Sequence, residues 1–448
     1  MIKCRIMLAA VIACATQSIC LGQVRQWSLD DCLNYALENN ISLQKSILAV
    51  KSASEDRKQS QAALFPTLSF GTNHSLGYNP WINSDVTMVT NGTVNSAKKA
   101  SFSDNYSLNA NWTVWNGNRN RNQVKLNRLL ENEAVLDSAV TANNIQELIA
   151  QYYIRALYLK EAISVAANSV EVSKANEDRG KNFVEVGNMS KADLAQLTAQ
   201  RSQDEYSLVE AKSELTTCLV QLKQILELPG HTEFDVLDIN ATDAQALQQV
   251  PALENVYAKA LDSRPEIKRG LMAIEGSKLQ EKIAKAGYWP SIGLSAGTGT
   301  GTSTMGSNSW AQQMKLNFDM QVGLSISIPI FDQRQNKTAV NKAKIQQEQA
   351  RLDLLDSQKN LYATLESYWE QAITNQQKFI AATANVESMQ VSYNLLEEQF
   401  TLGLKNVIEL MTGKSKLLQA QQNMLQSKYT TILNLQMLKF YQKDYEKN

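Results

Sequence analysis

Few residues of this 448-residue chain have the chemistry of a metal ligand or a nucleophile. There are two histidines, His74 and His231, and neither has a cysteine or carboxylate at the spacing of a metal site. The sequence contains neither a Walker nor a zincin pattern. We therefore expect no metal, no cofactor and no enzymatic activity. Cys32 and Cys218 lie in helical patterns, and we interpret both as buried thiols.

The N-terminus has the order of features of a signal peptide. Lys3 and Arg5 precede the apolar stretch 6–15, and small residues up to Gly22 provide a cleavage site. A second interpretation is a lipobox that ends at Cys14, which would become a lipidated N-terminus. That would leave a short apolar core, so we favour cleavage after Gly22.

Two stretches of the chain alternate between apolar and polar residues, which is the pattern of a half-buried strand. The alternation runs from Tyr106 to Val114 and from Phe318 to Ile330, and weaker partners begin at Leu68 and Ile292. Polar loops at 79–103 and 302–316 separate the members of each pair. We therefore predict four strands of about 11–13 residues, each with one apolar and one polar face.

Helical patterns position these strands. A capping box at Ser28 opens the first helical region, whose pattern resumes from Ile41 and stops at Pro66, and its counterpart runs from Pro265 to Pro290. Very long helical stretches cover 118–226 and 333–440, and a glycine interrupts each once, Gly187 in the first and Gly403 in the second. At 1.5 Å per residue, the roughly 60 residues before each glycine would span about 90 Å.

The chain is a tandem duplication with halves of about 200 residues. ALFPTLSFG recurs as AGYWPSIGLSAG at an offset of 224 positions, and NWTVWNGNRNR recurs as SIPIFDQRQNK at an offset of 216. The resulting division of the first half is a signal peptide at 1–22, an N-terminal helix at 23–66, a strand pair at 67–116 and long helices at 117–226. A linker at 227–263 follows. The second half has a second-repeat helix at 264–289, a second strand pair at 290–331, long helices at 332–440 and a tail at 441–448.

The apolar strand faces need cover, and four strands are too few to close a membrane barrel, for which the smallest known number is 8. Strands of this length match a tilted membrane-spanning strand of about 9–11 residues. Closure would require several chains. The alternative is a small four-stranded sheet that packs on the helices. Aromatic residues at the strand ends fit a membrane-interface girdle, with a satellite core cluster as the alternative: Trp112, Trp115, Trp289, Tyr78 and Trp81.

The duplicated motifs, together with FVEVGNMSKADL and FTLGLKNVIEL around the two glycines, resemble the outer membrane efflux protein family of TolC-like channels over almost the whole mature length. The resemblance implies a mainly helical chain with a transmembrane β-barrel. Three chains would each supply four strands to one 12-stranded barrel, and the long helices would continue it as an α-barrel tunnel.

In that family, polar links between helices of the two halves close the periplasmic end. The resemblance assigns the acidic position to Asp193, its basic partner to Lys405, and the helix breaks to Gly187 and Gly403. The aromatic position is Phe400, which lacks the hydroxyl of a tyrosine and so cannot make one of the links. The alternative is that Asp193 and Lys405 are solvated helix charges, worth about 0–1 kcal/mol even if they meet.

The resemblance also aligns Glu409 with an acidic position that lines the pore constriction. Three copies would form a carboxylate ring that favours cations. The family's second acidic position is Thr412 here, so the ring would be single. The alternative is an ordinary exposed helix residue.

As a function, the resemblance implies a homotrimeric outer-membrane exit duct with its tunnel in the periplasm. It would passively conduct substrates for a tripartite efflux pump or a type I secretion system. Its partners would be a periplasmic adaptor (membrane fusion) protein, an inner-membrane RND, ABC or MFS transporter, and outer-membrane lipid. The 44 basic and 44 acidic residues balance, which argues against nucleic acid. The alternative function is an envelope coiled-coil structural or adhesion protein with small β tips.

Overall fold

The computed structural model describes residues 26–81, 87–90, 93–96, 98–237, 242–306 and 308–442. The predicted signal peptide, with Cys14, lies outside the described residues. The chain forms two compact units, and each draws on both sequence halves. The first unit runs to Lys45, takes in Ala139–Arg264 and continues from Lys359, whereas the second contains Ser46–Ser138 and Pro265–Gln358.

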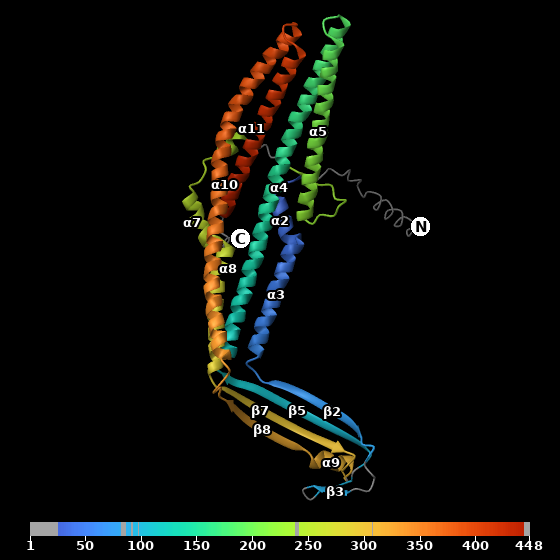
Figure 1. The fold of residues 1–448 in the computed structure, drawn as a ribbon, viewed down its shortest axis with the longest axis vertical. Helices are drawn as coiled ribbons and strands as arrows, with labels where there is room; N and C mark the ends of the chain where they lie inside the picture. The colour runs from blue at the N-terminus through green and yellow to red at the C-terminus, as the bar shows by residue number, and fades with distance from the viewer. Residues whose placement is uncertain are drawn as a thin grey trace, which may run out of the picture. The chain divides into compact units, whose positions relative to one another are not determined.

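The described elements follow one another in the order drawn in Figure 1. The first half contains β1 (Gln26–Trp27), α2 (Leu29–Asn39), α3 (Ile41–Ala62), β2 (Thr67–Tyr78), β3 (Thr87–Thr90), β4 (Thr93–Ser96), β5 (Ala100–Asn116), α4 (Arg119–Glu185) and α5 (Lys191–Ile225). The linker contains β6 (Asp235–Val236), α6 (Asp243–Ala246) and α7 (Leu253–Ser263). The second half contains α8 (Pro265–Lys285), a 3₁₀ turn (Ala286–Tyr288), β7 (Ser291–Ser303), α9 (Trp310–Leu316), β8 (Asp319–Ser327), α10 (Gln335–Thr401) and α11 (Val407–Tyr441).

The long helices have matched bounds in the two halves. Helices α4 and α10 each have 67 residues, and α5 and α11 each have 35. Both pairs are displaced by 216 positions, from 119 to 335 and from 191 to 407. The predicted long helices with one break each are therefore confirmed.

The turns from strand into long helix also match, within the second unit. Gly117 and Asn118 have φ values of 66° and 64°, and Gln333 and Arg334, 216 positions later, have 53° and 67°. Only the first turn has a glycine, and a Cβ at Gly117 would lie 2.8 Å from the backbone oxygen of Ala286. The close approach explains why this position has no side chain.

Equivalent asparagines fasten each long helix to the element before the neighbouring strand. Asn120 Nδ2 donates to the carbonyl oxygen of Ala63 (3.3 Å), and Asn336 Nδ2 donates to that of Gly287 (2.8 Å). Each bond satisfies a backbone acceptor where a helical segment ends, which is a position that leaves carbonyls without intrahelical partners.

Strands β2, β5, β7 and β8 form one antiparallel sheet in that order (Figure 1). Because directly opposed residues share a face, the register aligns two sets across all four strands. Leu68, Ala110, Ala296 and Val322 lie on one face, and the neighbouring row Ser69, Asn109, Gly297 and Gln321 lies on the other. The predicted strands with one apolar and one polar face are therefore confirmed.

The boundaries differ from the prediction at several points. Strand β5 begins at Ala100, six residues early, and β8 ends at Ser327, because Pro329 lacks the N–H that would continue the pairing. The expected loop at 302–316 contains helix α9, which starts with a capping box at Ser309. The lengths of β2, β5, β7 and β8 are 12, 17, 13 and 9 residues, a wider range than expected.

The N-terminal helix predicted over 23–66 is two helices, although its capping box between Ser28 and Asp31 is confirmed. The chain breaks at Asn40, whose backbone is extended. The Asn40 side chain donates to the carbonyl oxygen of Ile225 (2.9 Å) and accepts from the N–H of Ser42 (2.9 Å). The bonded side chain replaces the backbone bonds that a continuous helix would have made.

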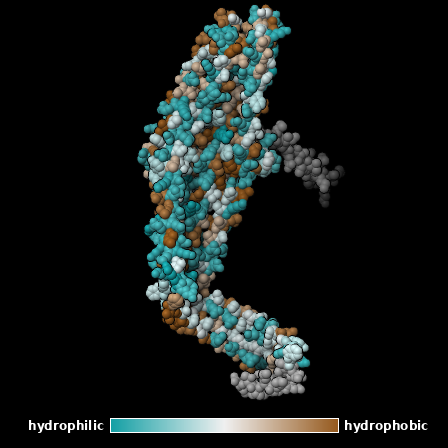
Figure 2. Space-filling model, viewed as in Figure 1, coloured by the Kyte–Doolittle hydropathy of each residue, from teal (hydrophilic) through white to brown (hydrophobic). Residues whose placement is uncertain are grey.

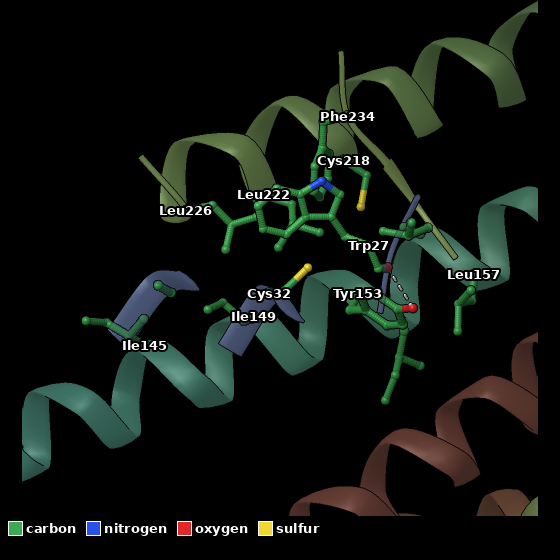
Figure 3. Close-up of a cluster of buried hydrophobic side chains, with 14 of the residues drawn as sticks. Trp27, Cys32, Ile145, Ile149, Tyr153, Leu157, Cys218, Leu222, Leu226 and Phe234 are labelled. Atoms are coloured by element: carbon green, nitrogen blue, oxygen red, sulfur yellow. Dashed lines mark hydrogen bonds between the residues drawn. The ribbon is translucent and has the colours of Figure 1, made fainter. Parts of the chain in front are cut away.

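The core of the first unit surrounds Trp27 and combines α2, α4 and α5 (Figure 3). The hydroxyl of Tyr153 donates to the carbonyl oxygen of Trp27 (3.2 Å), so the buried ring also fixes the N-terminal strand. Cys32 and Cys218 are 0% and 3% exposed within this core, and both are free thiols. The prediction of two buried thiols is confirmed.

Hydrophilic residues predominate on the face of the long helices drawn in Figure 2, with hydrophobic ones scattered among them. None of the described helices combines the length and the apolar character needed to cross a membrane.

Candidate functional site

The first candidate site is formed by the two turns that end α4 and α10. At the first turn, the N–H of Asn188 donates to the carbonyl of Phe183 (2.7 Å) and the N–H of Gly187 to that of Val184 (3.1 Å). The second turn repeats both bonds 216 positions later. This is the Schellman arrangement, which needs a left-handed residue, and Gly187 and Gly403 have φ values of 80° and 74°. The glycines are therefore required for backbone conformation.

The helices that leave the two turns begin with side-chain caps. Ser190 Oγ accepts from the N–H of Asp193 (3.0 Å) and donates to its carboxylate (2.8 Å). Asn406 Oδ1 accepts from the N–H of Glu409 (2.9 Å). Both acidic residues thus lie in a first helical turn, where the helix dipole favours negative charge.

Both turns line one cleft, and its lining includes all five predicted gate residues, namely Gly187, Asp193, Phe400, Gly403 and Lys405. The other lining residues are Phe183, Asn188, Met189, Ser190, Thr401, Leu402, Asn406 and Val407. Within it, Lys405 Nζ lies 3.0 Å from Glu409 Oε1. In the described part of the chain, Asp193 and Lys405 do not form an ion pair, and Asp193 is held by Ser190 instead. Their link therefore stays a prediction.

Glu409 is partly exposed, and its environment favours the charged form. The hydrogen bond from Lys405 lowers the pKa of Glu409, and a hydrogen bond from the backbone of Asn406 acts in the same direction. The carboxylate therefore stays ionised to a lower pH than an isolated glutamate.

Phe400 is a core residue beside the two turns that end α4 and α10, which we call the tip turns. It is 3% exposed, and its ring centroid lies 5.9 Å from that of Phe183 on α4. Phe400 thus joins the helical hairpins α4–α5 and α10–α11 through apolar contact. Val407 and Leu410 belong to the same cluster.

A charged network further along the helices was not among the predicted sites. Lys414 and Asp204 form an ion pair, and Ser173 bonds to both groups. Lys414 also donates to the carbonyl oxygen of Ser169 (2.8 Å), and Asp204 accepts from Gln200 (2.9 Å). Burial lowers the pKa of Lys414, and Asp204 opposes this effect.

The sequence contains a signal for this network. Val407, Leu410, Lys414 and Leu417 are spaced by three and four residues, which is the heptad pattern of a packed helix face. All four are buried, so a lysine occupies a position where an apolar residue is expected. A charge inside a heptad pattern indicates a buried partner.

The second candidate site is the apolar face of the sheet. Its exposed residues include Leu68 at 71% and Val322 at 78%. At the helix-proximal end, Trp112 Nε1 donates to the carbonyl oxygen of Leu64 (2.8 Å), and the rings of Trp115 and Trp289 meet edge to face at 6.3 Å. Three of the aromatic residues predicted at the strand ends, Trp112, Trp115 and Trp289, therefore form contacts there.

The same face contains a polar cluster. His74, Asp104 and Thr302 are aligned across β2, β5 and β7. His74 Nδ1 lies 2.5 Å from Asp104 Oδ1, and Thr302 Oγ1 donates to Asp104 Oδ2 (3.2 Å). No carboxylate near His74 was expected, because its partner lies on a neighbouring strand. In the described residues, no group of three or more histidine, cysteine or acidic side chains could hold a metal.

One sequence pattern suggests chemistry that the fold does not support. Gly293-Leu-Ser295-Ala-Gly297 has the spacing of a nucleophile elbow. That motif requires a sharp turn between a strand and a helix, whereas these residues lie inside β7 and pair on both sides. Ser295 is therefore a strand residue of the polar face.

The family model for outer membrane efflux proteins matches residues 32–227 and 256–441, one range in each half. The chain belongs to the outer membrane efflux protein family. It is an outer-membrane channel protein of efflux or secretion systems, with its helical part in the periplasm, and it is not an enzyme.

Two relatives span most of this efflux family member. The alkaline protease secretion protein AprF of Pseudomonas aeruginosa is 22% identical over 423 residues, which cover 92% of this chain and 83% of AprF. The outer membrane protein TolC of Escherichia coli is 21% identical over 408 residues, which cover 88% of this chain and 78% of TolC.

Solved structures share its fold. The outer membrane protein VceC of Vibrio cholerae has a TM-score of 0.78 at 15% identity, and the aligned region covers 93% of this chain and 97% of VceC. CusC has a TM-score of 0.76 at 17% identity, with coverages of 94% and 95%. The tip turns and the sheet described above thus belong to an outer membrane efflux channel fold.

Proposed function

We propose that three copies of this chain form one channel, in which each copy contributes β2, β5, β7 and β8 to a 12-stranded transmembrane barrel. The supporting observation is the sheet. Its apolar side chains are exposed on one face, whereas its other face is polar and glycine-rich. Strands β2 and β8 are its edges, and a barrel removes such edges by pairing them.

The long helices would continue this barrel as a periplasmic tunnel. A straight helix of 67 residues measures about 100 Å. Substrates would enter from an inner-membrane RND, ABC or MFS transporter through a periplasmic adaptor and pass through without catalysis. The alternative of an envelope coiled-coil scaffold does not account for an exposed apolar sheet face, and the family match does not favour it.

Fractionation and mild-detergent gel migration test this proposal. The expected result is recovery in the outer membrane as a detergent-dependent trimer that conducts ions in planar lipid bilayers. Recovery as a soluble monomer that forms no pores would overturn it.

For the gate, we propose that Asp193 and Lys405 link neighbouring helices when the channel is closed. Lys405 would then leave Glu409 and pair with Asp193, and both carboxylates are partly exposed. Gly187 and Gly403 would set the turns, and Phe400 would pack between the hairpins.

The variant Asp193→Ala/Lys405→Ala should raise basal conductance and admit a large antibiotic in whole cells. A matched control is Glu55→Ala/Lys58→Ala, which removes an exposed ion pair of α3 (2.7 Å) in the second unit. A gate variant that leaks no more than this control would defeat the assignment.

A further inference from the structure

We propose that Lys414 and Asp204 fix the register between the helical hairpins α4–α5 and α10–α11, and thereby hold the periplasmic end of the channel in one alignment. The proposal deepens the exit-duct function and rests on it only for the conductance readout described below. It assigns a positioning role to residues outside the predicted gate.

The network is charged, buried and fully bonded. Lys414 is 7% exposed and Asp204 is 5% exposed. The ammonium group has three acceptors, namely the Asp204 carboxylate, the Ser173 hydroxyl and the Ser169 carbonyl. Because a lysine ammonium has three donors, no donor is left unused in this arrangement.

Such a pair contributes more to specificity than to stability. Removing two charges from water costs about as much free energy as their attraction returns, so a buried pair is a weak source of net stability. A polar residue at a heptad position, in contrast, can specify how two helices align, because the wrong alignment leaves it without a partner.

The apolar contacts around the network lack this selectivity. Next to the network, α11 presents Leu410 and Leu417, and α5 presents Leu197, all in one apolar cluster. A shift by one helical turn, about 5.4 Å, exchanges one leucine contact for another. The same shift would separate the Lys414 ammonium from its three acceptors, so the charged pair distinguishes the alignments.

Three further variants separate register from stability: Lys414→Met, Asp204→Leu and the double variant. Each single change leaves an unpaired buried charge, so each should lower the Tm of the purified channel. The double variant has an apolar contact instead and should recover most of the Tm. The control is Arg57→Met/Glu131→Leu, which removes a cross-helix pair (2.5 Å) in the second unit.

The register is measured with spin labels at Ser202 on α5 and Thr412 on α11, both exposed, in channels diluted with unlabelled chains. Wild type and control should give one narrow distance distribution, whereas the double variant should give a broadened or shifted one. Its basal conductance should also rise about tenfold, which corresponds to about 1.4 kcal/mol.

A double variant that keeps both the narrow distribution and the wild-type basal conductance would overturn the proposal. So would single variants with the wild-type Tm. The two proposals can fail separately. If the wild type forms no pore, but its distance distribution is narrow and that of the double variant is broad, the exit-duct function is rejected and the register role is retained.

Discussion

Single residues at the two tips differ in how their carboxylates are held. The Ser190 hydroxyl binds Asp193, whereas the Lys405 ammonium binds Glu409. The hydrogen bond and charge of Lys405 lower the pKa of Glu409. The two carboxylates are therefore related by the duplication but differ in their surroundings.

Glu409→Gln tests whether this carboxylate contributes to ion selectivity. The substitution removes the charge and keeps the shape, so we expect the preference for cations to fall, measured as the reversal potential across a KCl gradient. Because the pKa of Glu409 is lowered, wild-type selectivity should persist at pH 5 and decline only below the ordinary pKa of about 4.3.

The control for this experiment is Glu398→Gln, an exposed carboxylate of α10 before the same break. Equal losses in the two variants would argue against a ring of Glu409 side chains.

Cys32 provides a second prediction at this scale. Burial raises its pKa to about 12, so at pH 8 only about one thiol in ten thousand is the reactive thiolate. We expect maleimide to label neither Cys32 nor Cys218 in the native channel and both in denaturant, as measured by mass spectrometry. Rapid labelling of Cys32 without denaturant would contradict its placement in the core.

At the level of elements, each helix after a tip turn depends on its cap. Ser190→Ala removes the side-chain acceptor for the N–H of Asp193 and should destabilise the start of α5 by about 1 kcal/mol. Hydrogen exchange at 191–194 should accelerate, whereas exchange at the start of α11 should not change. The control is Ser202→Ala, an exposed change within the same helix. Equal exchange at Asp193 in both variants would exclude a capping role.

The elements also show how far the sequence predicts this fold. The long helices were predictable because they contain no proline and break at glycine. The start of β5 was not predictable, because Ser103, Asp104 and Asn105 interrupt the alternation of apolar and polar residues. There Asp104 occupies an apolar-face position, where His74 and Thr302 bind it from neighbouring strands.

The candidate site was predictable only in part. The tip turns follow from local chemistry, because glycine supplies the left-handed backbone and serine or asparagine supplies the cap. The pair of Lys414 with Asp204 joins residues 210 positions apart, which no local spacing encodes. Only the charge within the heptad of α11 pointed to it.

For the whole molecule, the sheet offers a test that compares adjacent residues. Val322 lies on the apolar face and Gln321 on the polar face of β8. If the apolar face meets lipid, Val322→Lys should cost about 2–4 kcal/mol near the bilayer midplane, whereas Gln321→Lys should cost little. The measurement is the amount of trimer in outer-membrane fractions. Equal amounts for the two variants would contradict a lipid-facing assignment.

The edge strands β2 and β8 have a consequence for how the channel assembles after export. Among the described residues, the outer edges of β2 and β8 have no neighbouring strand in the sheet of a single copy, and they lie next to an exposed apolar face. Such edges can pair with any available strand, so a newly exported copy would aggregate unless it is shielded. Completion of the proposed trimer would depend on encounters between copies, and its rate would rise steeply with their concentration. Slow export would therefore reduce the yield of channels more than proportionally, even when every chain is intact.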